Sequence, residues 1–289
     1  MKLLRFGETG HEKPGILDSQ GMVRDLSAYV DDFNPQTICD PEFILRLRSL
    51  DLEKLPCIAD TVRIGACIDR PGKILCIGLN SLLHAKEMGL PALKQDMLVF
   101  LKPSSAICGP TDPIPYAPHM RKLDWEAELA IVVGRRGKYI QQQDAEDYIL
   151  GYTCLNDLTE RYLQLETEDK QFTKGKGFDC AAPIGPYLVT KEEIKNSQDL
   201  NLRLWVNGIL RQSFNSSDYI HSAAQIIEYV SQYFTLYPGD IISMGSAPGS
   251  APFWGDDYFL KPNDRVVFCI EGLGQQEQFV ILEDHSNLR

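Results

Sequence analysis

Residues 123–133 read LDWEAELAIVV, which is the pattern of a buried β-strand that carries two carboxylates at its entrance. Side chains alternate between the two faces of a strand, so we expect Glu126 and Glu128 to point the same way. Two like charges that lead into an apolar strand are costly unless a cation neutralises them. The stretch therefore indicates a site for a hard divalent cation.

A third carboxylate, Asp157, lies in LNDLTER at residues 155–161, a segment also bounded by apolar sequence. Three carboxylates leave positions open for water and substrate, which is typical of Mg²⁺ or Mn²⁺ sites, with Ca²⁺ as a further candidate. The competing interpretation is a solvated acidic strand face followed by an Asn-Asp turn. Spacing alone favours that competing interpretation.

Around this strand, turn signals separate short apolar segments, and long helical patterns are few. This predicts a mainly β fold with a few helices, of the α+β class. Asn207-Gly208 between two strand patterns predicts a β-hairpin, and residues 222–232 have helical spacing. Arg70-Pro71-Gly72 interrupts the chain, so we expect a small N-terminal domain at 1–70 and a catalytic domain at 71–289.

Composition narrows the class of function. Hydrophobic residues make up 44% and charged residues 24%, as in globular proteins, and the formal net charge is −11. An acidic surface repels phosphate, so we expect neither nucleic acid nor a membrane as a partner. The opening residues lack a secretion signal, and the eight cysteines form no C-x-x-C pair. We therefore expect a cytoplasmic protein.

His84 and Glu87 lie three residues apart in segment 80–89, which we expect to form a short helix with Asn80 as its N-cap. A carboxylate beside an imidazole raises its basicity and orients it to deprotonate water. An ordinary surface ion pair is the alternative, and spacing alone favours it.

An anionic substrate requires local positive charge in a protein this acidic. Arg161 and Gln164 follow Asp157 at +4 and +7, which would place all three on one helical face. Lys176 lies between two glycines, which would let the backbone approach a ligand closely. Ser246 lies in a loop of small residues, 244–250, that would line a pocket or merely connect two elements. Solvated surface charges are the more common interpretation of Arg161 and Lys176.

In their order along the chain, these segments resemble the fumarylacetoacetate hydrolase family over roughly residues 73–282. The unit before them resembles the family's N-terminal region. The matching pieces are Ile77-Gly78-Leu79-Asn80 with His84 and Glu87, LDWEAEL at 123–129, Gly151-Tyr152-Thr153 with Asn156-Asp157 and Glu160-Arg161, GKGFD at 175–179, PIGP at 183–186, Val206-Asn207-Gly208 with Gln212, LYPGD at 236–240 and LKPND at 260–264.

The resemblance implies a mixed β-roll/β-sandwich fold with a small N-terminal unit, and a homodimer. It implies Mg²⁺ or Mn²⁺ on Glu126, Glu128 and Asp157. The remaining implied roles concern catalysis and substrate binding: a His84–Glu87 dyad that activates water, Lys176 stabilising negative charge, and Arg161, Gln164 and Ser246 near the substrate. The opening of the chain looks most like the bacterial branch of 2,4-diketo-3-deoxy-sugar-acid hydrolases.

Three departures from the family pattern lie on the substrate side: Ser81 stands where Tyr is common, the loop 244–249 is altered, and 250–258 lacks the usual Val-Gly. We expect hydrolysis of a carbon–carbon bond in a small anionic keto acid of the 2,4-diketo type, an acylpyruvate or a diketo-deoxy sugar acid. Oxaloacetate decarboxylation or keto–enol isomerisation on the same metal is one alternative. A non-catalytic metal- or ligand-binding protein is another.

Overall fold

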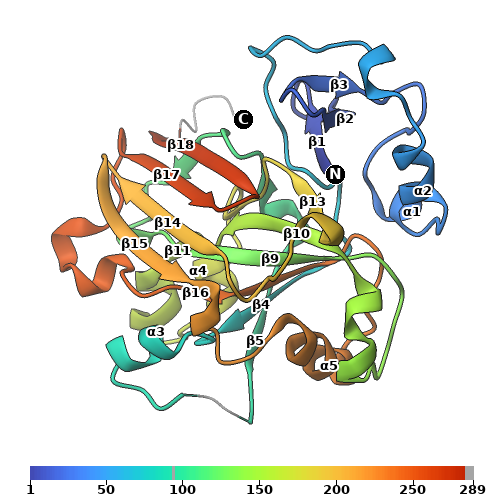
Figure 1. The fold of residues 1–289 in the computed structure, drawn as a ribbon. Helices are drawn as coiled ribbons and strands as arrows, with labels where there is room; N and C mark the ends of the chain where they lie inside the picture. The colour runs from blue at the N-terminus through green and yellow to red at the C-terminus, as the bar shows by residue number, and fades with distance from the viewer. Residues whose placement is uncertain (93–94, 284–289) are drawn as a thin grey trace.

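The structure is a computed structural model that describes residues 1–92 and 95–283. Its largest element is a nine-stranded mixed sheet that runs from the N-terminal segment to the centre of the molecule (Figure 1). In spatial order its strands are β3 (Val23–Asp25), β2 (Lys13–Leu17), β1 (Lys2–Phe6), β13 (Leu188–Thr190), β10 (Ile149–Asn156), β9 (Ala127–Val133), β16 (Ile241–Ser246), β4 (Ile74–Gly78) and β5 (Leu98–Lys102).

Strand β9 lies between β10 and β16, and all seven of its residues are buried. Burial on both faces explains why residues 127–133 read as a nearly continuous apolar run. The two strands that flank it run antiparallel to it. The carboxylates at its start are therefore held at one end of the centre of the sheet.

A second sheet of five strands covers the other side of the main core: β15 (Ile209–Asn215), β14 (Asn201–Val206), β17 (Arg265–Ile270), β18 (Gly274–Leu282) and β7 (Ile114–Tyr116). Two two-stranded ladders pair β11 (Thr159–Glu160) with β8 (Leu123–Asp124), and β12 (Ala182–Pro183) with β6 (Ile107–Cys108). As the turn chemistry predicted, Asn207 and Gly208 connect β14 to β15 with φ values of 52° and 78°.

The described α-helices are short: α1 (Pro35–Ile38), α2 (Phe43–Arg48), α3 (Leu82–Glu87), α4 (Phe172–Lys176) and α5 (Ala223–Tyr233). The prediction of a mainly β fold with a few helices is thus confirmed. Helix α5 begins at Ser222, whose side chain closes a capping box with Gln225. No helix in the described ranges combines the length and hydrophobicity that a membrane crossing requires.

Residues 1–70 form the lobe at the upper right of Figure 1, which contains β1–β3, α1 and α2. Its sheet continues into the rest of the molecule, because Leu3 of β1 is in register with Leu188 of β13. Leu3 and Ile16 share one core cluster with Ile74 and Val132. The domain boundary near residue 70 stays a prediction, and the apolar core runs across it.

Candidate metal centre and active site

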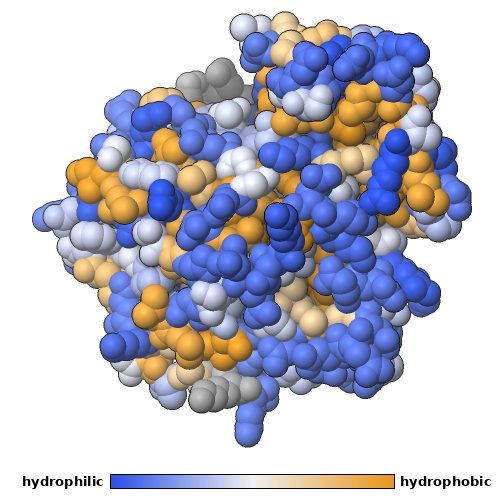
Figure 2. Space-filling view, viewed as in Figure 1, coloured by the Kyte–Doolittle hydropathy of each residue, from blue (hydrophilic) through white to orange (hydrophobic). Residues whose placement is uncertain are grey.

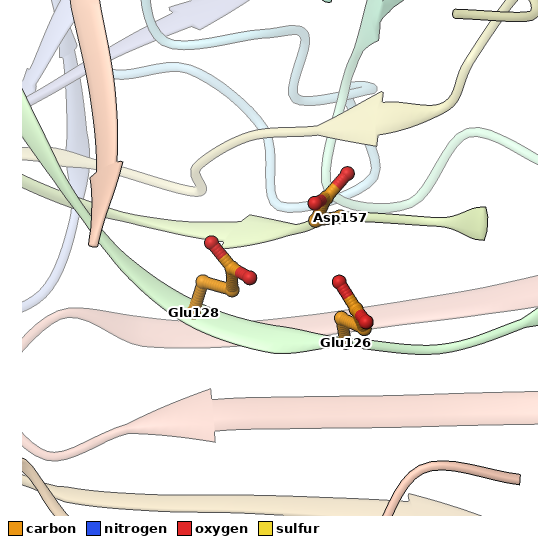
Figure 3. A group of neighbouring side chains, drawn as sticks. All are labelled: Glu126, Glu128 and Asp157. Carbon is orange, nitrogen blue, oxygen red and sulfur yellow. The ribbon is translucent and has the colours of Figure 1, made fainter. Parts of the chain in front are cut away.

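The antiparallel pair β9–β10 brings the three predicted carboxylates together. Glu126 precedes β9, Glu128 lies within it, and Asp157 directly follows β10. The Asp157 N–H donates to the Glu126 carbonyl at 2.9 Å, which closes the end of the ladder. One oxygen from each carboxylate lies within 4.8 Å of those of the other two. Figure 3 shows the three side chains converging on one space.

Three buried cations surround this cluster of carboxylates. Lys176 Nζ lies 2.7 Å from both Glu126 Oε2 and Asp157 Oδ2. Arg161 Nη2 lies 2.5 Å from Glu126 Oε1, and Lys102 Nζ lies 2.5 Å from Asp157 Oδ1. Burial alone would raise the pKa of Glu126, but the charges of Arg161 and Lys176 outweigh it and hold that pKa well below its usual range.

Glu128 has no such partner among the described residues. Its carboxylate accepts hydrogen bonds from the Ser243 hydroxyl and, at 3.2 Å, from the Gly245 N–H. Burial, and then the charges of Asp157 and Glu126, raise the pKa of Glu128 well above its usual range. Glu128 is therefore the one carboxylate of the cluster that forms no ion pair with a described cation.

This charge balance and the donor set fit a divalent cation. The donors are carboxylate oxygens, which hard cations such as Mg²⁺ and Mn²⁺ prefer. Four buried carboxylates, those of Asp124 and the three cluster residues, face the three buried cations. With all four carboxylates ionised, the group has one more negative than positive charge. A divalent ion would change this to one excess positive charge, which the carboxylate of an anionic ligand would balance.

His84 and Glu87 also come together, on helix α3. His84 Nδ1 lies 3.1 Å from Glu87 Oε2, and His84 is 7% exposed. The Glu87 carboxylate accepts the Gly249 N–H, with both oxygens at 3.1 Å, so a loop distant in sequence orients the pair. The prediction that Asn80 caps this helix is wrong, because the N-cap is Ser81, whose hydroxyl accepts the His84 N–H at 3.0 Å.

Asn80 is buried and makes long-range hydrogen bonds instead. Its amide donates to the Met244 carbonyl at 2.7 Å and accepts the His221 N–H at 2.8 Å. These bonds tie the start of α3 to strand β16. The Asn80 side chain is therefore used in tertiary contacts, which the local sequence pattern does not reveal, and is not available to cap the helix.

Arg161 and Gln164 reach the carboxylate cluster, but by a different route from the one we expected. Strand β11 and then a π-helical turn, Tyr162–Glu166, follow Asp157, so no single helical face carries the three. Arg161 Nη1 donates to Gln164 Oε1 at 3.1 Å, while its other nitrogens bind Asp124 and Glu126. The guanidinium thus holds the carboxylates in place.

Gly175 allows close packing of the chain on itself. A Cβ at Gly175 would lie 2.8 Å from Gln164 Cβ and 2.9 Å from the Glu160 carbonyl oxygen. Helix α4 therefore approaches the 160–164 segment closely and directs Lys176 into the cluster. Ser246 is 5% exposed, and its Oγ accepts a hydrogen bond from Gln212 Nε2 at 3.2 Å.

The sequence interpretation did not identify Lys102 and Asp124. Lys102 is 1% exposed and also donates to the Leu158 carbonyl at 3.1 Å. Asp124 accepts the backbone N–H groups of Trp125 and Ala251, both at 2.8 Å. The only local signal for Lys102 was a single charge at the end of the apolar strand β5. That signal does not tell a buried ion pair from a solvated strand end.

A cavity of about 280 Å³ opens over the cluster. The three carboxylates, His84, Lys176, Arg161, Gln164 and Ser246 all line it. All the predicted site residues except Glu87 thus face one space, and Glu87 reaches it through His84. Their individual roles stay predictions.

Comparison with known proteins gives consistent matches. Residues 73–281 match the family model of the fumarylacetoacetate hydrolase C-terminal domain. A protein from Burkholderia multivorans is 45% identical over 284 residues, which cover 96% of this chain and 98% of that protein. Its name describes it as a hydrolase and gives no substrate.

Two solved structures bear on the chemistry. The maleylpyruvate hydrolase from Sphingobium sp. SYK-6, in complex with manganese(II) and pyruvate, is 26% identical with a TM-score of 0.82. The 5-carboxymethyl-2-hydroxymuconate delta-isomerase from Mycobacterium smegmatis is 28% identical with a TM-score of 0.75. Each match covers 98% of this chain and 100% of the other.

Proposed function

This chain belongs to the fumarylacetoacetate hydrolase family, and from that premise we propose that it is a divalent-metal-dependent hydrolase that cleaves a carbon–carbon bond in a 2,4-diketo acid. One observation carries the proposal: the acidic cluster and His84 line the same cavity. The cluster offers a place for an electrophilic cation, and His84 offers a base for water.

Glu126, Glu128 and Asp157 would hold Mg²⁺ or Mn²⁺, with Ca²⁺ as a further candidate. When bound, such a cation supplies Lewis-acid charge at the 1-carboxylate and 2-oxo group of a keto acid. The lack of a described cation partner at Glu128 supports this assignment. So does the Sphingobium relative, whose structure contains manganese and pyruvate.

The side chains of this chain would perform the remaining steps. His84, oriented by Glu87, takes a proton from water, and the water oxygen attacks C4 of the substrate. The C3–C4 bond then breaks, its electron pair stays on C3 as the enolate of a pyruvate-like product, and C3 takes up the proton. Lys176 stabilises the developing negative charge, and C4 leaves as a carboxylic acid. Arg161, Gln164 and Ser246 would contact the substrate.

A second candidate is keto–enol isomerisation or oxaloacetate decarboxylation at the same centre. The similarity to the Mycobacterium smegmatis delta-isomerase supports it. Both reactions require a stabilised enolate but no attacking water. A non-catalytic metal- or ligand-binding protein is the third candidate, and the altered loop 244–258 is the feature that supports it.

A substrate panel separates these candidates. Wild-type protein and His84→Ala would be assayed with Mg²⁺ or Mn²⁺ on 2,4-diketo acids and oxaloacetate, with metal content measured on the same samples. We expect the wild type to hydrolyse the diketo acids and His84→Ala to lose roughly 10²-fold or more in kcat, because the general base is gone, while metal content is unchanged.

Hydrolysis of diketo acids by His84→Ala at the wild-type rate would remove His84 from the mechanism. Turnover of oxaloacetate alone, or isomerisation alone, would favour the second candidate. Metal binding without turnover of any panel member would favour the third.

We also propose a homodimer located in the cytoplasm, with a small anionic keto acid as its ligand and with neither nucleic acid nor a membrane as a partner. The net charge of −11 supports the exclusion of anionic polymers and surfaces.

A further inference from the structure

The cavity over the metal centre has two chemically different ends. The inner end holds the three carboxylates with Lys176 and Arg161. The outer end, defined by lining side chains that are accessible to solvent, consists of large apolar residues from four segments of the chain: Met88, Leu90, Leu98, Leu165 and Phe253. The inner end recognises the charged head of a keto acid in the proposed function, and the outer end is left for the group attached to C4.

The cations of the inner end are already engaged. Lys176 Nζ donates to Glu126, Asp157 and Thr159 Oγ1, each at 2.7 Å. Arg161 is bound to Asp124 and Glu126 and to Gln164. Among the described residues, no other lysine or arginine lines the cavity. A second carboxylate on the distal arm of a substrate would find no described cation to pair with at the outer end.

The apolar side chains at the outer end are accessible to solvent. Each of the five is between 37 and 46% exposed. Figure 2 shows an apolar patch at the lower left of the molecule, over the region where Figure 1 places α3. Apolar groups that gather around the mouth of a cavity mark a site for an apolar ligand, because covering them removes their surface from water.

Phe253 connects this apolar end to the reacting bond. Its ring packs edge-on against His84, with 6.0 Å between the ring centroids. If His84 activates the water that attacks C4, the substituent on C4 must lie close to Phe253. The apolar wall therefore contacts the part of the substrate that differs between one 2,4-diketo acid and another.

We infer that this enzyme selects 2,4-diketo acids whose distal acyl group is apolar and uncharged, a short alkyl chain or a single aromatic ring, over those with a distal carboxylate or several hydroxyls. This inference rests on the proposed function. Ser250, 2% exposed, and Ser246 are the only hydroxyl-bearing side chains among the described lining residues, too few for a polyhydroxylated chain.

The test compares substrates with a common head. The metal-loaded enzyme would be assayed on 2,4-dioxopentanoate, 2,4-dioxooctanoate, 2,4-dioxoheptanedioate and 5,6-dihydroxy-2,4-dioxohexanoate. We expect kcat/KM for dioxooctanoate to exceed the values for the diacid and the dihydroxy acid by about tenfold or more. Equal or better turnover of the diacid or the dihydroxy acid would overturn the inference. No cleavage of any of the four would instead count against the proposed function.

A variant with altered specificity gives an independent measurement. Leu98→Arg places a cation at the outer end. The ratio of kcat/KM for 2,4-dioxoheptanedioate to kcat/KM for 2,4-dioxooctanoate should therefore rise by about tenfold. Leu101→Arg is the matched control, because Leu101 lies on the same strand, is 44% exposed and does not line the cavity. An equal shift in both variants would mean that net charge, and not the cavity wall, sets the preference.

Discussion

Glu126 and Glu128 are two residues apart on one face, yet the structure gives them different electrostatic partners. Glu126 is paired with Arg161 and Lys176, whereas Glu128 is bonded, among the residues that the structure describes, only to neutral donors. Removing one member of a buried ion pair leaves the other charge unpaired, which costs far more than neutralising a charge that had no partner.

We therefore expect the two substitutions to differ in their effect on the stability of the metal-free protein. Glu126→Gln should lower the free energy of unfolding by about 3 kcal/mol, while Glu128→Gln should change it by less than about 1 kcal/mol. Both should abolish the rise in Tm that Mg²⁺ or Mn²⁺ causes in the wild type. Thermal unfolding with and without metal checks this, and a metal-dependent Tm in Glu128→Gln would exclude that residue as a ligand.

Lys102 allows a second prediction at the same scale. It is fully buried against Asp157, so Lys102→Met should destabilise the metal-free protein by about 3 kcal/mol. The same change leaves the cluster more negative, so the rise in Tm on adding Mg²⁺ should be larger than in the wild type. Lys174→Met is the control, since Lys174 pairs with Asp169 at an exposed position. A smaller metal response in Lys102→Met would contradict this electrostatic account.

The residues found from the sequence differ from those missed in the kind of contact they make. Strand alternation is local, and it placed Glu126 and Glu128 on one face. The pairing of Lys102 with Asp157 joins positions 55 residues apart, and Asn80 bonds across 164 residues to Met244. No periodic pattern encodes such contacts, so the pairing of Lys102 with Asp157 could be recognised only in the folded structure.

At the scale of elements, the loop after β16 and helix α3 act as one unit. Gly249 has φ +97°, and a Cβ there would lie 2.1 Å from the Arg211 carbonyl oxygen. Its N–H holds Glu87, and its carbonyl accepts the indole N–H groups of Trp125 and Trp254. The loop after β16 thus supports the His84–Glu87 pair as well as the cavity wall.

Gly249→Ala should displace this loop and release Glu87 from its orientation. We expect kcat to fall by roughly tenfold or more, because the base is no longer positioned, while metal affinity is retained. Gly255→Ala is the matched control: its φ is +111°, but a Cβ there would meet nothing closer than 3.8 Å. Steady-state kinetics with metal titration check this, and an equal loss in both variants would show that backbone strain alone is responsible.

The β14–β15 hairpin was predictable from its turn residues, whereas the structure of the segment after Asp157 depends on tertiary contacts. Asn207-Gly208 needs positive φ at both positions, a local requirement that the hairpin meets. The predicted helix through Asp157, by contrast, is replaced by strand β11, because the Asp157 N–H is used to close the ladder with Glu126. Backbone bonds to a distant strand thus overrode the helical spacing of Arg161 and Gln164.

At the scale of the whole molecule, the sequence predicts a small unit before residue 70, and the core crosses that boundary. Leu3 and Ile16 pack in the same cluster as Ile74, Ala130 and Val132, and β1 continues the central sheet through β13. These residues reach from the N-terminal lobe to β9, the strand that carries Glu128 of the carboxylate cluster. The stability of the catalytic part should therefore depend on the lobe.

We accordingly expect a fragment of residues 71–289 to lose cooperative unfolding and to bind hydrophobic dyes, because removing the lobe exposes the apolar surface around Ile74 and Val132. In the full chain, Leu3→Ala should lower stability by about 3 kcal/mol in a single transition that also releases the metal. Leu45→Ala, at a position 55% exposed, is the control. Calorimetry with metal-release measurements checks both expectations. A fragment that melts cooperatively and retains turnover would show instead that residues 71–289 fold independently of the lobe.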